Sequence, residues 1–428
     1  MKHFLLAIVV LCALCIAGFT AEQEDRFLKQ AKEILREVPL IDGHNDLPWQ
    51  IREKFKNHMQ EVDLMDTTKL DPPFHTDIPR LKTGMVGGQF WSVYVPVERK
   101  GADAVHDVLE QIDIVYLFVE KYPKDFEMAY TAADIQRIHK KGKVASLIGI
   151  EGGHCINNSL GVLRQLFRSG ARYMTLTHWS GTDWADAATA DPKHNGLTPF
   201  GELVIKEMNR LGMLVDLSHV SAQTMNKVLD IARSPVIFSH SSARAISGHP
   251  RNVPDDILKR LPSNGGVVMV NYALLFVSEE HRKWNSTEEA EKARLKDLFI
   301  GNPEEIKLQT ENWQKANPKP QVTLQQLADH IDHIRKTAGI DHVGLGADLD
   351  GITETPVGLK DVSAYPALMA ELLRRGYTKE EVKKVAGLNV LRVMKKTEQN
   401  AAILQQEVAP QDRKIEEVDT VSMPDSRK

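Results

Sequence analysis

Cysteine is scarce in this chain, which has three cysteines among 428 residues. Cys12 and Cys15 lie in an apolar stretch at the N-terminus, so Cys155 is the one cysteine outside that stretch. If the stretch is removed, an intrachain disulfide cannot form, and the hydrophobic core has to stabilise the fold alone. We expect Cys155 to be a buried free thiol, with a bond between subunits as the alternative.

Positive charge is not in excess, and long apolar runs are missing after the first 20 residues. A formal net charge of −4 lacks the basic character of a nucleic-acid-binding protein. No later stretch reaches the ~20 apolar residues that a membrane-spanning helix needs. The last residues, EEVDTVSMPDSRK, contain no apolar segment that would direct a lipid anchor. We therefore expect no nucleic-acid partner, no transmembrane helix and no lipid anchor.

The N-terminus has the layout of a signal peptide. Lys2 precedes an apolar run over residues 4–16, and small residues follow that run. The run is shorter than a membrane span, which favours cleavage near residues 17–21 over an uncleaved anchor. We expect residues 1–20 to be removed from a secreted, extracellular protein, or from a periplasmic one in a bacterium.

Two stretches match the acceptor pattern for N-glycosylation. Asn157 is followed by Asn158 and Ser159, and Asn285 by Ser286 and Thr287. The pattern has a meaning only for a protein exported by a eukaryotic cell. In such a source we expect a glycoprotein.

Short apolar runs alternate with amphipathic helical stretches along most of the chain. We expect eight strands, over residues 39–43, 89–96, 145–150, 172–177, 213–218, 235–239, 267–272 and 342–346. Strands separated by helices form parallel sheets, and eight such units are typical of a closed (β/α)8 barrel of the TIM type. An open doubly wound sheet is the alternative, but no glycine-rich nucleotide loop follows the first expected strand.

The barrel is expected to form a single domain over residues 22–398, with a polar C-terminal tail over 399–428. A charge-dense insertion over residues 277–322 interrupts the alternation before the last strand. We interpret it as a helical excursion over the barrel mouth, either part of the site or a solvated segment without function. The pattern of apolar residues over 365–396 predicts two helices that close the barrel after its last strand.

Side chains with metal-ligand chemistry follow most of the expected strands. They are His44, Asp46, Glu151, His154, His178, His219, His240, Asp348 and Asp350. The carboxyl ends of barrel strands meet at one mouth, so these side chains are expected to converge. His44 and Asp46 are two positions apart and share a face of their strand. Imidazole and carboxylate ligands, with positions left open for water, suit zinc.

The stretches around these residues resemble the membrane (renal) dipeptidase family, which belongs to the amidohydrolase-like metal-dependent barrels. The resemblance runs from about residue 40 to 396 and is carried by LIDGHNDLPW, GGQFWSVYVP, ASLIGIEGGH, YMTLTHW, LVDLSHVS, PVIFSHSSA, HPRNVPDD and GLGADLDG. It implies a zinc-dependent dipeptidase that hydrolyses the peptide bond of small-molecule dipeptides through a hydroxide bridging two Zn²⁺ ions per chain. It also suggests a homodimer.

The resemblance implies a role for each site residue. The implied zinc ligands are His44 and Asp46 for one ion, His219 and His240 for the other, and Glu151 for both. His178 is implied to contact the substrate carbonyl and the developing oxyanion, and Arg251 to bind the substrate carboxylate. Asp348 is implied to handle the proton; from the strand period alone, Asp350 is an equal candidate.

One difference from the family pattern and two alternative functions bear on these expectations. Phe276 stands where family members can carry a tyrosine that helps to hold the substrate carboxylate. Another metal-barrel hydrolase, acting on lactones or amides, is one alternative, and Arg251 argues against it. A catalytically inactive barrel is the other, and the presence of every implied ligand together with Asp348 argues against that.

Overall fold

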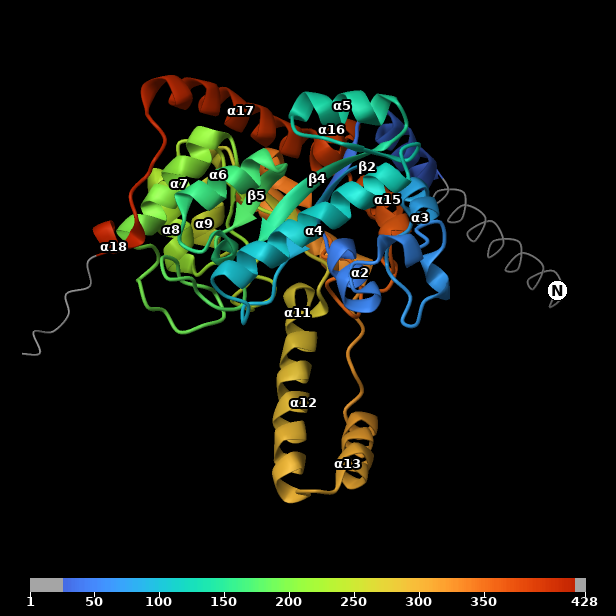
Figure 1. The fold of residues 1–428 in the computed structure, drawn as a ribbon. Helices are drawn as coiled ribbons and strands as arrows, with labels where there is room; N and C mark the ends of the chain where they lie inside the picture. Colours follow the sequence, from blue (N-terminus) through green and yellow to red (C-terminus); the bar gives the residue numbers. More distant parts are fainter. Residues whose placement is uncertain (1–25, 420–428) are drawn as a thin grey trace, which may run out of the picture.

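Eight parallel strands close into a barrel, which confirms the predicted (β/α)8 fold (Figure 1). In this computed structural model, which describes residues 26–419, the barrel strands are β1 (Leu40–Asn45), β2 (Val86–Tyr94), β4 (Val144–Glu151), β5 (Ala171–Thr175), β6 (Leu214–Asp216), β7 (Ile237–Phe238), β8 (Val267–Val270) and β9 (Val343–Leu345). Each overlaps a predicted strand, with ends that differ by a few residues. Pairing of β2 with both β1 and β4 closes the circuit.

One further strand, β3 (Phe126–Met128), was not predicted. It pairs in parallel with the first residues of β4, from Val144 to Ser146, while β5 pairs with the last residues of β4. Because β2 occupies the opposite edge of β4, β3 lies beside the barrel wall and outside its circuit. Three residues are too few to show the alternation that indicates a strand.

Helices surround the barrel (Figure 1). After a helix over residues 26–37, they are α2 (Leu47–Phe55), α3 (Ile78–Thr83), α4 (Ala102–Lys121), α5 (Ala132–Lys140), α6 (Leu160–Arg168), α7 (Pro199–Leu211), α8 (Ala222–Ile231), α9 (Asp255–Leu258), α10 (Leu261–Asn264), α11 (Leu274–Val277), α12 (Glu279–Leu298), α13 (Pro303–Ala316), α14 (Leu324–Ala338), α15 (Tyr365–Arg374), α16 (Lys379–Lys383), α17 (Asn389–Glu407) and α18 (Ile415–Val418). Several of these helices begin at a residue whose side chain caps the N-terminus. Thr131 caps α5 and Thr323 caps α14, each in a full capping box. None of the helices in the described range is long and apolar enough to cross a membrane.

The barrel interior is packed by side chains from alternating strand positions, among them Ile41, Phe90 and Tyr173. Tyr173 crosses the interior directly over Gly149, where an added Cβ would lie only 2.0 Å from the tyrosine ring. Gly149 therefore makes room for Tyr173, whose hydroxyl reaches the end of β1. Cys155 is a buried free thiol, as predicted. Cys12, Cys15 and the predicted signal peptide lie outside the described residues.

The charged insertion is a helical hairpin formed by α12 and α13, so its predicted helical character is confirmed. The hairpin points away from the barrel and does not lie across the mouth (Figure 1). Its sequence explains this, because α12 buries few side chains and α13, described over its whole length, buries none. Only the end of the hairpin nearest the barrel lines the cavity at the barrel mouth, through His281, Asn285 and Lys319.

The predicted closing helices are α15 and α16–α17, but the predicted start of the polar tail at residue 399 is wrong. Helix α17 continues to Glu407, and its Ala401 and Leu404 are buried. These apolar residues extend the buried face of α17 into the polar stretch that was predicted to be a tail. The chain then follows α7, where the backbone N–H of Phe200 donates to Asp419 at 2.8 Å.

Candidate metal centre

The carboxyl ends of the barrel strands surround a cavity of about 670 Å³. Seven of the eight predicted site residues line it: Asp46, Glu151, His178, His219, His240, Arg251 and Asp348. The eighth, His44, is fully buried beneath them and contacts Glu151 from the end of β1. The structure thus brings every predicted site residue into one cluster.

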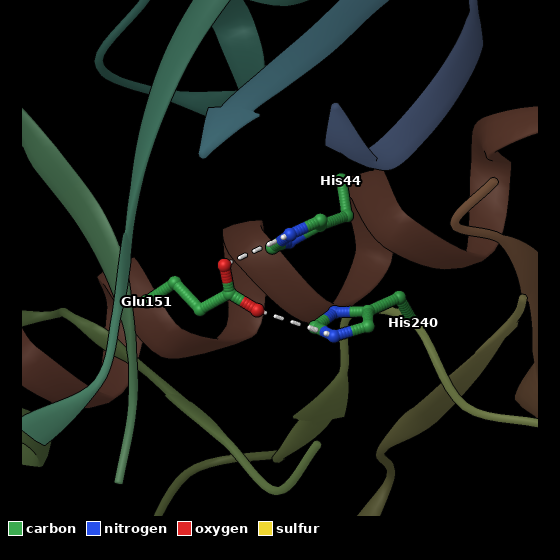
Figure 2. A group of neighbouring side chains, drawn as sticks. All are labelled: His44, Glu151 and His240. Carbon is green, nitrogen blue, oxygen red and sulfur yellow. Dashed lines mark ion pairs between the residues drawn. The ribbon is translucent and has the colours of Figure 1, made fainter. Parts of the chain in front are cut away.

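Glu151, the last residue of β4, lies at the centre of this cluster. One of its oxygens, Oε2, is 3.5 Å from Nε2 of His44. The other, Oε1, is 3.2 Å from Nε2 of His219 and 3.5 Å from Nε2 of both His240 and His178. Figure 2 shows the two oxygens directed at different imidazoles, His44 on one side and His240 on the other. The Glu151 carboxylate therefore lies between two groups of side chains that could donate electron pairs to a metal, and it contacts both groups.

The first group consists of His44, Asp46 and Asp348. Nε2 of His44 is 3.3 Å from the Asp46 carboxylate and 4.0 Å from that of Asp348. Nδ1 of His44 lies 2.8 Å from the hydroxyl of Tyr173, which itself donates to the carbonyl oxygen of Gly43. Because that hydroxyl proton is used, His44 has to donate from Nδ1. Burial would lower the pKa of His44, but Tyr173, Glu151 and Asp46 beside it raise that pKa well above its usual value, so a metal ion would have to displace the proton on Nε2. This buried Nε2 has no hydrogen-bond partner among the described residues.

The second group consists of His219 and His240. Their Nε2 atoms are 2.9 Å apart, and burial lowers the pKa of both rings well below the usual value, so both are neutral. Burial alone would raise the pKa of Glu151, but the imidazoles around it, His44 and His178 foremost, lower it well below its usual value. The neutral rings of His219 and His240 and the ionised carboxylate of Glu151 face one point, which is what a metal cation requires. The donor set fits metal binding.

The structure distinguishes the two aspartates that the strand period left equivalent. The Asp348 carboxylate faces the cluster, accepts from Asn271 Nδ2 at 2.9 Å, and has a pKa that burial raises to about 7. The Asp350 carboxylate turns aside and accepts from the backbone N–H of His75 at 2.6 Å. Both residues have positive φ, 62° and 66°, so the chain does not alternate as a strand would.

Arg251 is 1 % exposed and lines the cavity between the cluster and α11. Its guanidinium makes two long hydrogen bonds, 3.3 Å to Ser241 Oγ and 3.2 Å to the carbonyl oxygen of His240. Nε is buried and unpaired among the described residues. Phe276 packs beneath the guanidinium, with its ring centre 5.2 Å away. The guanidinium of Arg251 therefore keeps N–H donors available for an anion in the cavity.

Sequence reasoning missed three residues that shape the site. Tyr173 sets the tautomer of His44, and Asn271 donates to Asp348. Gly351 lies so near the carboxylates that an added Cβ would be 2.2 Å from Oδ2 of Asp46. Gly351 stands directly after Asp350 in GLGADLDG, and a glycine directly after two closely spaced aspartates was the available signal. Tyr173 lies on β5 and Asn271 directly follows β8, and neither has a local sign of its partner in the sequence.

Comparisons with known proteins identify the family of the chain. A sequence model of the membrane dipeptidase family (peptidase family M19) matches residues 28–408. The chain is 40% identical over 386 residues to dipeptidase verJ of Clonostachys rogersoniana, a match that covers 88% of each protein.

Two solved structures share the fold. One is the probable dipeptidase PvdM from Pseudomonas aeruginosa, with a TM-score of 0.72 and 23% identity over 88% of this chain and 100% of that one. The other is a metallo peptidase from Rhodobacter sphaeroides bound to a phosphinate mimic of the dipeptide L-Ala-D-Ala, with a TM-score of 0.68 and 24% identity over 84% and 99%. The family model and dipeptidase verJ both match most of the chain, which therefore belongs to the membrane dipeptidase family and is a metallo-dipeptidase.

Proposed function

We propose that this enzyme hydrolyses dipeptides with two zinc ions per chain, held on either side of Glu151. The observation that carries the proposal is the division of the Glu151 oxygens between two groups of donors. His44, Asp46 and Glu151 would hold one ion, and His219, His240 and Glu151 the other. When bound, the zinc ions would supply Lewis acidity at the scissile carbonyl and an acidified water at neutral pH.

Asp348 is the residue we propose to move the proton. Its carboxylate faces Nε2 of His44 at 4.0 Å, and burial raises its pKa to about 7. A carboxyl group with that pKa can accept a proton from the attacking water and give it to the departing amine. Asn271 keeps the group oriented, because its own oxygen accepts from the backbone N–H of Ala273 and its nitrogen must then face Asp348.

His178 is the residue we propose to stabilise the substrate carbonyl. Its Nε2 lies beside Oε1 of Glu151, and its Nδ1 has no partner among the described residues. Burial lowers the pKa of His178 to about 4, so the ring is neutral at physiological pH. A neutral imidazole can donate one hydrogen bond to oxygen as negative charge develops there, without holding a second charge in the ground state.

Arg251 is the residue we propose to bind the free carboxylate of the dipeptide. A dipeptide carries that carboxylate one residue beyond the scissile bond, so a fixed cation at the matching distance selects substrates by length. The guanidinium is held in place by Ser241, by the His240 backbone and by Phe276. An arginine fork matches a carboxylate in two hydrogen bonds, which a lysine cannot do.

A dipeptide-library assay on zinc-loaded protein, run beside lactone and simple amide substrates, tests the proposal. We expect cleavage of dipeptides, loss of activity after chelation, and recovery on adding zinc. The alternative metal-barrel hydrolase requires turnover of lactones or simple amides in preference to dipeptides. An inactive barrel requires no turnover with two ions bound, and the buried Arg251 beside a complete donor set disfavours both alternatives.

Export is the proposed fate of the protein, and residues 1–20 support it. N-terminal sequencing of protein from the medium or periplasm should find a start near residues 17–21; intact Met1 would contradict cleavage. Asn157 is exposed and Asn285 lies half-buried at the cavity wall, so both remain predicted glycan sites in a eukaryotic source. A homodimer also remains a prediction, which the mass of the purified protein in solution tests.

A further inference from the structure

A fully buried carboxylate, Asp216 at the end of β6, lies behind the second group of donors. It accepts four hydrogen bonds from residues of three strand ends. Oδ1 accepts from the backbone N–H groups of Ser218, at 3.0 Å, and Ser239, at 2.8 Å. Oδ2 accepts from the hydroxyls of Thr175 and Ser239, both at 2.6 Å. A buried carboxylate with this many donors is fully satisfied and holds the ends of β5, β6 and β7 together.

The hydroxyl of Ser239 links Asp216 to His240. A hydroxyl has one proton, and that of Ser239 is donated to Asp216 because a carboxylate can only accept. Ser239 Oγ also lies 2.8 Å from Nδ1 of His240, so it must accept there, and Nδ1 carries the ring proton. Nε2 of His240 is then the free lone pair, and it faces Oε1 of Glu151 at 3.5 Å.

The same carboxylate also holds the backbone that carries both histidines. Its two N–H donors, on Ser218 and Ser239, belong to the residues directly before His219 and His240. His219 has a φ of 69°, a left-handed conformation that costs energy for a residue with a side chain. The hydrogen bond to Ser218 constrains the chain at the entry to that turn.

We propose that Asp216, acting through Ser239, is the positioning residue of the second metal site. It sets the tautomer of His240 and the approach of both histidines without touching substrate or metal. This assignment rests on the two-ion function proposed above. Groups of this kind behind metal ligands raise metal affinity because they orient the ligand and select its unprotonated nitrogen.

The test compares the Ser239→Ala and Asp216→Asn variants with Thr175→Val. Thr175→Val is the matched control, since it removes a hydrogen bond of equal length to the same Asp216 oxygen but leaves His240 and Ser239 in contact. Each purified protein is stripped and titrated with zinc against a chromophoric chelator, and thermal unfolding reports whether it is folded. We expect Ser239→Ala to weaken the second ion by ~10–100-fold, while Thr175→Val stays near wild type.

Asp216→Asn has a sharper expected result. The two backbone N–H donors cannot turn, so the amide oxygen must take the Oδ1 position and the NH2 group the Oδ2 position. Ser239 then accepts from that NH2 and turns its own proton toward Nδ1 of His240, which moves the ring proton to Nε2. Loss of second-ion affinity should equal or exceed that of Ser239→Ala, with the first ion still bound.

Two outcomes separate this proposal from the one it rests on. If wild-type protein binds two ions and folded Ser239→Ala binds both as tightly as Thr175→Val does, the role of Asp216 and Ser239 is purely structural and the proposal is wrong. If wild-type protein itself binds fewer than two ions, the two-ion function fails first. Should Asp216→Asn not fold, the comparison of Ser239→Ala with Thr175→Val still decides.

Discussion

Replacing Arg251 with alanine should remove the preference of the enzyme for dipeptides over longer or amidated substrates. The guanidinium is almost fully buried, its two hydrogen bonds are long, and its Nε has no partner among the described residues, so it has donors to offer to the substrate carboxylate that we propose it binds. A charge-assisted contact of this kind contributes about 1.5–3 kcal/mol. At 1.4 kcal/mol per decade, kcat/KM for dipeptides should fall ~10–150-fold in Arg251→Ala.

The assay measures kcat/KM for a dipeptide, its C-terminal amide and the tripeptide extended at that end, in wild-type and variant protein. Wild-type enzyme should prefer the dipeptide by at least ~10-fold, and Arg251→Ala should lose that preference by slowing the dipeptide alone. Arg251→Lys is the control that keeps the charge but not the fork, and it should recover only part of the preference. Equal cleavage of all three substrates by wild-type enzyme would refute both the Arg251 assignment and the length selection.

Three further substitutions have defined expected results. Asp348→Asn should lower kcat by ~10²–10⁴ with zinc content unchanged, and a near-normal rate in that variant beside an inactive Asp350→Asn would reverse the assignment of the two aspartates. Gly351→Ala places a Cβ 2.2 Å from a carboxylate oxygen of Asp46, so zinc affinity should fall while thermal unfolding stays cooperative; unchanged affinity would show that this turn can shift. Phe276→Tyr adds a hydroxyl beside Arg251 and should lower KM for dipeptides by about 2–10-fold, whereas an unchanged or higher KM would show that the hydroxyl cannot reach the carboxylate.

That the candidate ligands lie together was predictable because the barrel itself determines where the strand ends lie. His44, Glu151, His219 and His240 each follow a strand that apolar, β-branched residues identify, and parallel strands of one barrel end at the same mouth. Sequence spacing within one strand, as between His44 and Asp46, then gives the shared face. The resemblance to a known family added the individual roles.

What could not be predicted depends on contacts between distant parts of the chain or on local departures from strand geometry. Asp348 and Asp350 were equivalent under strict alternation, but both adopt left-handed backbone conformations, and of the two only the Asp348 carboxylate faces His44. Asp216 gave no local signal because its four donors come from three strand ends. The end of α17 was missed since Leu404 is buried by tertiary packing within a polar stretch.

The central claim is that Glu151 joins two zinc ions in one site, and metal titration of the stripped enzyme tests it most directly. Zinc bound per chain is measured beside dipeptide hydrolysis at each addition, for wild-type protein and for Glu151→Gln. The account predicts two ions per wild-type chain, with activity rising as the second ion binds, and at most one tightly bound ion in Glu151→Gln. Full activity with one ion bound, or hydrolysis by metal-free protein, would contradict it.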